Sequence, residues 1–299
     1  MRLRHITLAF AVALSVAACG GDPTKQAPAD GDEKAITVGS AAFPESEIIA
    51  EIYAQALEAK GITVRKKLNI GAREVYIPAL KNGEIDLIPE YTGNLLTYLD
   101  PKATASAPDA VTSALAEAVP ADLAVLEPAP AEDKDSLNVT AAFAKANDVK
   151  SIADLAKVDG LRLAANPEFK QRAYGIPGLE KVYGITGISF TPISDGGGPA
   201  TVKALVSGKV DVADIYSTTP SIKANKLVTL EDPKNLIAAQ NVVPLMRKDK
   251  ATDEVKDVLN AVSAALTTDE LLELNEANQG EDKTAPAVLA KEWVADHVK

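Results

Sequence analysis

The segment ALKNGEIDLIPEYTG, residues 79–93, decides the fold, because the chain repeats its pattern at residues 204–218 as ALVSGKVDVADIYST. Both copies read A-L-x-x-G-x-[IV]-D-[LV]-x-x-x-Y-[ST], and every matched position is offset by 125 residues. In each copy the apolar positions before the glycine fit the end of a helix, since glycine readily adopts the left-handed conformation that closes a helix. The short apolar run after the glycine predicts a buried strand.

Each expected strand is followed by a tyrosine, Tyr91 in the first copy and Tyr216 in the second. In open α/β sheets, ligands bind beyond the carboxyl ends of the strands. Two lobes that face each other across a cleft would therefore each present one tyrosine. The spacing leaves a second interpretation open, in which these are surface tyrosines of a supersecondary unit that two α/β lobes share.

Strand and helix patterns alternate on both sides of the two copies, which favours an α/β fold with largely parallel strands. Two irregular stretches interrupt this alternation: residues 127–135, which are rich in proline and acidic residues, and residues 231–240. The C-terminal segment from residue 240 onward is mostly helical and has too few strands to form a domain of its own, so we expect it to return to the first lobe. The prediction is a first lobe of residues 36–133 and 240–299 and a second lobe of residues 134–239, joined by two crossing segments as a hinged clamp.

Residues 1–19, MRLRHITLAFAVALSVAAC, have the basic start, apolar centre and small-residue end of a secretory signal. Their apolar run is shorter than the ~20 residues that a membrane-spanning helix needs. The ending V-A-A-C resembles the lipobox of bacterial lipoproteins, in which the cysteine receives the lipid, and Cys19 is the only cysteine of the chain. Residues 20–35 are polar and rich in glycine, proline and aspartate, so we expect a flexible tether and a body held outside the cell by its lipid.

The composition argues against several classes of function. A formal charge of −11 does not suit binding to nucleic acid, whose phosphates require a basic surface, or polybasic attachment to anionic lipid. The two histidines are His5, in the expected signal, and His297, near the C-terminus. A zinc site, a Ser-His-Asp triad or a Cys-His pair is therefore hard to assemble. Since the chain also contains neither a P-loop nor a G-x-G-x-x-G sequence, we expect no cofactor, no metal and no catalysis.

Five longer segments carry a resemblance to a known family. They are SAAFPESEIIAEIYAQALE (40–58), GAREVYIPALKNGEIDLIPEYTGNLLTYLDP (71–101), NPEFKQRAYGIPGLEKVYG (166–184), GGGPATVKALVSGKVDVADIYSTTPSI (196–222) and QNVVPLMR (240–247). They resemble the glycine betaine/choline-type substrate-binding proteins of osmoprotectant ABC transporters, and the resemblance spans residues 36–297. The R-E-V-Y and E-Y-T-G-N sequences are similar to one subgroup of that family. Membership implies a type II periplasmic-binding-protein fold, in which two α/β lobes close over a ligand.

The resemblance also implies a ligand site. In the better-known members, a box of tyrosines surrounds a trimethylammonium head and an arginine holds the carboxylate. Tyr91 and Tyr216 match two tyrosines of that box, and Arg172 matches the carboxylate arginine. Glu168 would lie one turn before Arg172 on the same face of a helix expected around residues 168–173.

Three positions depart from the family pattern. Asn94 stands where the motif has threonine, and Asp135 and Gln240 stand where box tyrosines are usual. Half of the box would therefore be missing. The charge of Asp135 would favour choline-like cations, whereas the planar fork of Arg172 would favour betaine or an amino acid, so the exact solute stays open.

Other residues could also contribute to the cleft. Phe43 follows the first expected strand and could form the pocket floor. Arg73 could contact a ligand carboxylate or form a surface salt bridge. Thr218 could donate a hydrogen bond near a strand end or cap a turn. Tyr76 and Tyr98 are expected to pack within a lobe.

The sequence thus predicts a monomeric, lipid-anchored extracytoplasmic protein that delivers a quaternary-ammonium osmolyte to the permease of an ABC importer. Contact with the membrane is expected through the lipid. Three alternatives stay open: an amino acid or another small polar cation as the ligand, an enzyme on the same two-lobed scaffold, and a surface lipoprotein that works by adhesion.

Overall fold

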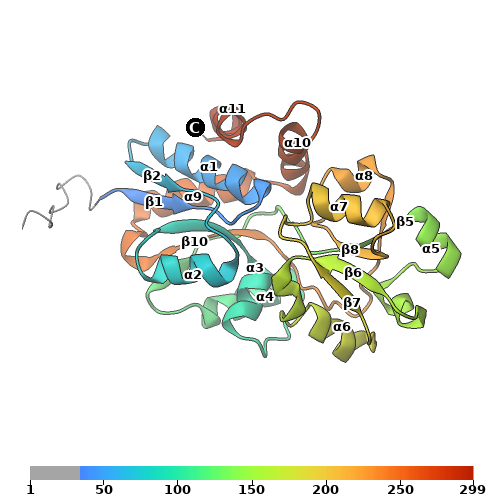
Figure 1. The fold of residues 1–299 in the computed structure, drawn as a ribbon. Coiled ribbons are helices and arrows are strands. Elements are labelled where there is room, and N and C mark those ends of the chain that lie inside the picture. Colours follow the sequence, from blue (N-terminus) through green and yellow to red (C-terminus); the bar gives the residue numbers. More distant parts are fainter. Residues whose placement is uncertain (1–33, 299) are drawn as a thin grey trace, which may run out of the picture. The chain divides into compact units, whose positions relative to one another are not determined.

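The strands of the protein form two separate five-stranded sheets (Figure 1). The computed structural model describes residues 34–298, so the expected signal, Cys19 and most of the expected tether lie outside the described residues. From Ala35 onward the described chain is one compact unit. None of its helices is both long and apolar enough to cross a membrane.

The first sheet has the strand order β2-β1-β3-β10-β4. Its strands are β1 (Ile36–Gly39), β2 (Val64–Lys67), β3 (Leu87–Tyr91), β4 (Leu123–Val125) and β10 (Val242–Arg247). One core contains α1 (Pro44–Ala59), α9 (Asp253–Ala265), α10 (Thr268–Gln279) and α11 (Pro286–His297), and another contains α2 (Arg73–Lys81), α3 (Thr92–Leu99) and α4 (Pro108–Ala118). Because side chains alternate along a strand, Leu87 enters the first core and Ile88 the second. Helices on both faces therefore hold the ends of β1 and β3 in place.

The second sheet has the strand order β7-β6-β8-β5-β9. Its strands are β5 (Leu137–Thr140), β6 (Arg162–Ala165), β7 (Ser189–Pro192), β8 (Val212–Asp214) and β9 (Leu227–Thr229). One core contains α5 (Ala141–Asn147), α6 (Ile176–Tyr183) and the short 3-10 helices η1 (Ile152–Lys157) and η2 (Pro167–Lys170); the other contains α7 (Pro199–Val206) and α8 (Ser221–Ala224). Leu163 enters the first of these cores and its neighbour Ala164 the second. Each sheet is thus the centre of one α/β lobe.

Two segments connect the lobes, from β4 to β5 and from β9 to β10. They lie side by side, because Glu132 and Asn241 form an antiparallel bridge. The Asp133 amide donates to the Gln240 carbonyl at 3.2 Å, which extends this contact. After the second crossing, β10 enters the first sheet, and the 3-10 helix η3 (Lys248–Lys250) and α9 to α11 follow. The C-terminal helices therefore pack on α1, as Figure 1 shows.

The repeated sequence pattern has the local structure that its residues indicate. In the first copy α2 leads into β3, and in the second α7 leads into β8. Gly83 and Gly208 follow these helices with φ of 74° and 71°, a conformation that favours glycine. The two patterns therefore place Tyr91 and Tyr216 at equivalent positions, at or just beyond the end of a buried strand.

The expectation of largely parallel strands is confirmed for the described residues. In each sheet four strands run in one direction, and one strand runs against them, β10 in the first sheet and β5 in the second. Both strands arrive from a crossing segment instead of a crossover helix, so they run against their neighbours.

The prediction of a helix around residues 168–173 is wrong. The chain forms only the short 3-10 helix η2 there, which ends at Lys170. Gly175 approaches the preceding turn so closely that a Cβ there would lie 1.9 Å from the Phe169 carbonyl oxygen. The chain therefore turns back at a point where a regular helix would continue. One helical contact remains, from the Arg172 amide to the Glu168 carbonyl at 3.0 Å.

Candidate ligand-binding site

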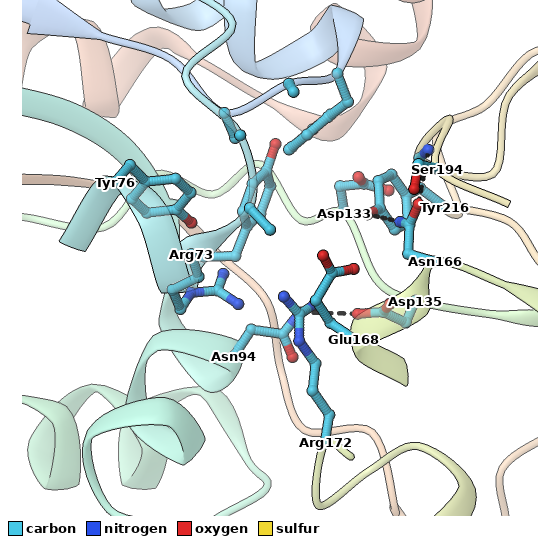
Figure 2. Close-up of a pocket in the computed structure, with 17 residues that line it drawn as sticks. Arg73, Tyr76, Asn94, Asp133, Asp135, Asn166, Glu168, Arg172, Ser194 and Tyr216 are labelled. Carbon is cyan, nitrogen blue, oxygen red and sulfur yellow. Dashed lines mark hydrogen bonds between the residues drawn. The ribbon is translucent and has the colours of Figure 1, made fainter. Parts of the chain in front are cut away.

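A cavity of about 270 Å³ lies where the strand ends of both lobes meet the first crossing segment. The first lobe supplies the residues after β1, the start of α2, Tyr91 and Asn94, and the second lobe supplies the residues after β6, β7 and β8. Figure 2 shows their side chains arranged around a common space. The lining residues are Ala41, Ala42, Phe43, Gly71, Ala72, Arg73, Tyr76, Tyr91, Asn94, Asp133, Asp135, Asn166, Glu168, Arg172, Ser194, Gly196 and Tyr216.

Three rings form an aromatic trio (Phe43, Tyr91 and Tyr216) on one side of this cavity. The Phe43 ring centroid lies 6.1 Å from that of Tyr91 and 5.3 Å from that of Tyr216, the latter pair edge to face. Phe43 therefore links the tyrosines of the two lobes. The structure brings all three of these expected site residues together, with Phe43 between the tyrosines.

Polar partners hold the hydroxyl groups of both tyrosines. Tyr91 donates to Glu45 Oε1 at 2.6 Å. Asn166 Nδ2 donates to the Tyr216 hydroxyl at 3.1 Å, and Asn166 Oδ1 accepts from the Gly196 amide at 3.1 Å. A hydrogen bond to its hydroxyl group therefore sets the orientation of each of these two tyrosine rings.

An acid pair (Glu45 and Asp133) lies next to the aromatic trio, and both side chains are buried. Glu45 Oε2 accepts from Thr218 Oγ1 at 2.6 Å and from Asn275 Nδ2 at 2.5 Å. Asp133 Oδ1 accepts from the Thr218 amide at 3.0 Å and from Ser217 Oγ at 3.1 Å. Thr218 therefore bonds to both acids from behind the cavity wall and does not line the cavity of the aromatic trio.

Burial raises the pKa of the Glu45 carboxyl, although its hydrogen bonds oppose the shift. Burial and then the Glu45 charge raise the pKa of Asp133 well above its ordinary value. Among residues 34–298, no ion pair includes either acid. The cavity therefore adjoins buried acidic groups that no described basic side chain neutralises.

A second acidic contact involves Asp135, two residues after Asp133 in the first crossing segment. Asn94 Nδ2 donates to Asp135 Oδ2 at 2.8 Å, as the dashed line in Figure 2 shows. The Gln240 side chain holds Asn94 in place through two hydrogen bonds. Its Nε2 donates to Asn94 Oδ1 at 2.8 Å, and its Oε1 accepts from the backbone amide of Asn94 at 2.9 Å. Gln240 therefore does not line the cavity but orients a residue that does.

Asp214, at the end of β8, is only 2% exposed, and its Oδ1 has no hydrogen-bond partner among the described residues. Burial and then the charge of Asp135 raise the pKa of Asp214 well above its ordinary value. Asp135 and Asp214 are therefore two neighbouring buried carboxyls on the side of the second lobe.

Arg73 lines the cavity but is not a free cation. Its Nε and Nη2 atoms donate to the two carboxylate oxygens of Glu90 at 2.7 and 2.8 Å, in a buried bidentate ion pair. Tyr76 donates to Glu90 Oε1 at 2.8 Å, so this ring also faces the site while it packs within the lobe. The expectation of a surface salt bridge for Arg73 is wrong, since its side chain is 6% exposed.

Arg172 is held more loosely, by the Tyr174 hydroxyl at 2.9 Å and by Glu74 Oε2 at 3.4 Å. Glu168 forms no hydrogen bond or ion pair through its carboxylate within the described residues, and Figure 2 shows it projecting toward the centre of the cavity. Arg172 and Glu168 therefore place opposite charges next to each other on the side of the second lobe.

Sequence reasoning misplaced one tyrosine and missed several polar residues. Tyr98 was expected to pack within a lobe, but it is 36% exposed and lines a neighbouring cavity of about 480 Å³ together with Tyr174 and Arg172. Glu45 and Asp133 were not expected at the site, although Glu45 directly follows the Phe43-Pro44 pair. An acid in a first helical turn is common for electrostatic reasons, so its position gave no separate signal.

Comparison with known proteins identifies relatives over almost the whole described chain. Residues 34–296 match the family described as the substrate-binding domain of ABC-type glycine betaine transport systems. The glycine betaine-binding protein YehZ of Escherichia coli K12 is 30% identical over 280 residues, which cover 88% of this chain and 90% of that protein. A glycine-betaine-binding protein of Pseudomonas aeruginosa is 25% identical and covers 88% of each chain.

A solved structure supports the same relationship. The crystal structure of a glycine betaine/carnitine/choline ABC transporter protein superimposes with a TM-score of 0.68 at 25% identity, over 88% of this chain and 98% of that chain. The expected type II periplasmic-binding-protein fold is therefore confirmed. The expected role in transport, without catalysis, is confirmed at the level of the family. The chain belongs to the family of substrate-binding domains of ABC-type glycine betaine transport systems.

Proposed function

We propose that the protein binds a quaternary-ammonium osmolyte such as glycine betaine between its two lobes and delivers it to the permease of an ABC importer. The observation that carries this proposal is the aromatic trio beside the acid pair. A quaternary ammonium has no N–H to donate, so a protein recognises it through aromatic faces and nearby negative charge. The relatives named as glycine betaine-binding proteins support the same choice.

The trio supplies more than the two tyrosines of the repeated pattern. Each cation–π contact contributes about 0.5–2 kcal/mol, depending on how fully the cation is desolvated. Phe43 offsets part of the loss of the two usual tyrosines, whose places Asp135 and Gln240 take. Asp133 and Asp135 line the same cavity and attract the cation directly.

The other end of the ligand would meet Arg172. Arg73 is less suitable for a carboxylate, because Glu90 already occupies its fork. Among the described residues, Arg172 forms one ion pair, which is 3.4 Å long and joins it to a half-exposed Glu74, so it can turn its guanidinium toward a ligand carboxylate. Asn94 lies at the same end and can contribute its amide.

A second candidate ligand is an amino acid or another small cation that carries N–H groups. The carboxylate of Glu168, which has no partner within residues 34–298, favours this alternative because it could accept from a primary ammonium. The same carboxylate would only attract a quaternary ammonium through its charge.

Calorimetry on the purified protein tests this choice. We expect heat of binding with at least one of glycine betaine, proline betaine, carnitine and choline, and weaker binding of glycine or alanine. Absence of binding for all four quaternary compounds, together with tight binding of a plain amino acid, would overturn the osmolyte proposal.

Arg172→Ala separates the two types of quaternary ligand. We expect this variant to bind carboxylate-bearing ligands at least tenfold more weakly, because a charged hydrogen bond of roughly 1.5–3 kcal/mol is lost, and to bind choline about as well as the parent. Calorimetry with glycine betaine and choline measures the two effects. An equal loss for both ligands would show that Arg172 does not contact the carboxylate.

We further propose the predicted lobe bounds, residues 36–133 with 240–299 and residues 134–239, as the two bodies that move about the paired crossing segments. Closure about two crossings is a common way to trap a ligand and to present the closed form to a permease. The bridge between Glu132 and Asn241 supports this hinge, because it keeps the crossings together.

The family places the protein on the extracytoplasmic side of the membrane, and we propose that a lipid on Cys19 holds it there. Substitution Cys19→Ala should release the protein from the membrane fraction. Mass spectrometry of the parent should detect the lipid, and an unmodified Cys19 in membrane-bound protein would contradict the proposal.

A further inference from the structure

Glu45 joins parts of the molecule that are far apart in the sequence. Its carboxylate accepts from Tyr91 on β3, from Thr218 after β8 and from Asn275 on α10, at 2.5–2.6 Å. Tyr91 and Asn275 belong to the lobe of the first sheet, and Thr218 belongs to the lobe of the second. One side chain thus connects a wall tyrosine of the first lobe to the segment that carries Tyr216 in the second.

Three side chains surround the Glu45 carboxylate. One oxygen of Glu45 accepts from Tyr91, and the other accepts from Thr218 and Asn275. A glutamine could keep these contacts, with its oxygen toward Thr218 and Asn275 and its NH2 donating to the Tyr91 hydroxyl, so Glu45→Gln removes the charge and retains the shape. Asp133 adds two further contacts to the Tyr216 segment, through Ser217 and the Thr218 amide.

The charge of Glu45 also lacks a described counter-ion. Glu45 is 3% exposed, and the ion pairs of residues 34–298 include neither it nor Asp133. A buried carboxylate without a cation is costly. The cavity beside it is lined by Tyr91 and Asp133, so a ligand cation there would supply the missing positive charge.

We propose that Glu45 is a positioning residue for the ligand cation, which holds Tyr91 and the Tyr216 segment around the cationic head and adds negative charge behind them. Glu45 itself does not line the cavity of the aromatic trio, so it acts through these neighbours. The inference rests on the proposed function and identifies the positive charge of the ligand, as well as its shape, as a determinant of binding.

The test compares a ligand that contains a quaternary nitrogen with a molecule of the same shape that lacks this positive charge. Choline and 3,3-dimethyl-1-butanol form such a pair, as do glycine betaine and 3,3-dimethylbutanoate, in which carbon replaces the charged nitrogen. The pair whose cation binds the parent protein is titrated by calorimetry, with the isostere measured by competition. Glu45→Gln is expected to weaken cation binding at least tenfold and to reduce the preference for the cation over its isostere.

Three further variants separate charge from structure. Glu47→Gln is the matched control, because Glu47 lies in the same helical turn and its carboxylate accepts from Asn69 Nδ2, away from the cavity lining. It should leave both affinities within twofold. Thr218→Val removes the hydrogen bond from Thr218 to Glu45, which joins the two lobes, but keeps the charge of Glu45. The affinities for the quaternary ligand and for its isostere should therefore both fall several-fold without a change in their ratio. Tyr91→Phe keeps the ring and removes its bond to Glu45, and should also weaken cation binding several-fold.

The results distinguish this inference from the proposed function. If the parent binds no quaternary cation, the proposed function fails. If the parent binds but Glu45→Gln stays within twofold, or lowers cation and isostere affinity by the same factor, the positioning role of the Glu45 charge is overturned. If Glu45→Gln melts below the assay temperature, Tyr91→Phe and Thr218→Val decide, and parent-like cation affinity in both would overturn the role.

Discussion

At the scale of single residues, the site depends on Phe43, whose ring contacts both wall tyrosines. Phe43 precedes Pro44, which begins α1, so the helix start fixes the backbone that carries the ring. A small residue at this position would leave Tyr91 and Tyr216 without a shared neighbour. The aromatic trio is therefore expected to act as a unit.

Alanine substitution of each ring measures this dependence. Tyr91→Ala, Tyr216→Ala and Phe43→Ala should each weaken binding of a quaternary ammonium by about 1 kcal/mol or more, through lost cation–π contact and packing. Calorimetry gives the affinities, and Tyr98→Ala is the control because Tyr98 is exposed and outside this cavity. Parent-like affinity in all three ring variants would contradict an aromatic site.

The acid pair predicts how pH acts on the protein without ligand. Burial raises the pKa of Glu45 above 4.5 and, with the charge of Glu45, that of Asp133 above 3.8. In the folded state these groups therefore keep protons at pH values where the unfolded chain has lost them. Since the folded state then binds more protons, the contribution of these groups to stability falls as pH rises from about 4 through their folded pKa values.

Asp133→Asn tests this sign. The free energy of unfolding of the parent, measured by chemical denaturation without ligand, should fall more steeply between pH 4 and pH 7 than that of the variant. Cation affinity of the parent should rise over the same range, because protons and the cation compete for the same carboxylates. The groups that hydrogen-bond to the pair are Tyr91 from β3, Ser217 and Thr218 after β8, and Asn275 from α10. The charge of Asp133 also acts on Asp214 at the end of β8, so Tyr91 and Asp214 are titratable neighbours. Identical pH slopes in parent and variant would rule out this linkage.

The sequence predicted side chains that line the cavity, but it did not predict Glu45, which holds Tyr91 in place by a hydrogen bond. Family resemblance placed Tyr91, Tyr216 and Arg172, and the position after a strand end indicated Phe43. Glu45 could not be found in this way, because its donors lie 46, 173 and 230 residues away along the chain. Such contacts depend on how two lobes and a C-terminal helix meet.

At the scale of elements, the two copies of the repeated pattern serve the same purpose with different surroundings. Gly83 and Gly208 both have positive φ, but a Cβ at Gly83 would lie 2.0 Å from Arg247 Nη1, whereas one at Gly208 would meet nothing within 4 Å. Alanine at Gly208 would therefore introduce only backbone strain, whereas alanine at Gly83 would add a steric clash with Arg247.

Gly208→Ala should destabilise the fold by about 1 kcal/mol, the cost of a left-handed conformation for alanine. Gly83→Ala should cost more, since Arg247 must also move from its ion pair with Asp249. Chemical denaturation measures both, and ligand affinity of Gly208→Ala should stay unchanged because the turn is remote from the cavity lining. A larger loss at Gly208 than at Gly83 would contradict this account.

Local pattern predicted most of the helices and strands but not all of their pairings. The apolar stripe after Pro44 and the C-terminal helical patterns correspond to α1 and to α9, α10 and α11. The directions of β5 and β10 depend on the crossings, which no local window contains. The end of η2 depends on the close approach of Gly175 to Phe169, a tertiary contact that a helical pattern cannot reveal.

At the scale of the whole molecule, side chains connect the two lobes around the cavity. Asn94 of α3 bonds to Asp135 near the start of β5, and Arg172 after η2 pairs with Glu74 of α2. The first contact is short and partly buried, and Gln240 of the second crossing holds it in place. The second is 3.4 Å long, and its glutamate side chain is 46% exposed. The Asn94–Asp135 bond should therefore contribute more than the Arg172–Glu74 ion pair to holding the lobes together over a ligand.

Asn94→Ala should weaken ligand binding by about 1–3 kcal/mol, because Asp135 loses its donor and Gln240 loses its acceptor beside the ligand. Glu74→Gln should change binding by less than about 1 kcal/mol, and this small effect should vanish at high salt, as for other exposed ion pairs. Calorimetry at low and high ionic strength measures both variants. A salt-sensitive loss at Glu74 that exceeds the loss at Asn94 would show that exposed charge, instead of the buried hydrogen-bond chain through the crossing, holds the lobes together over the ligand.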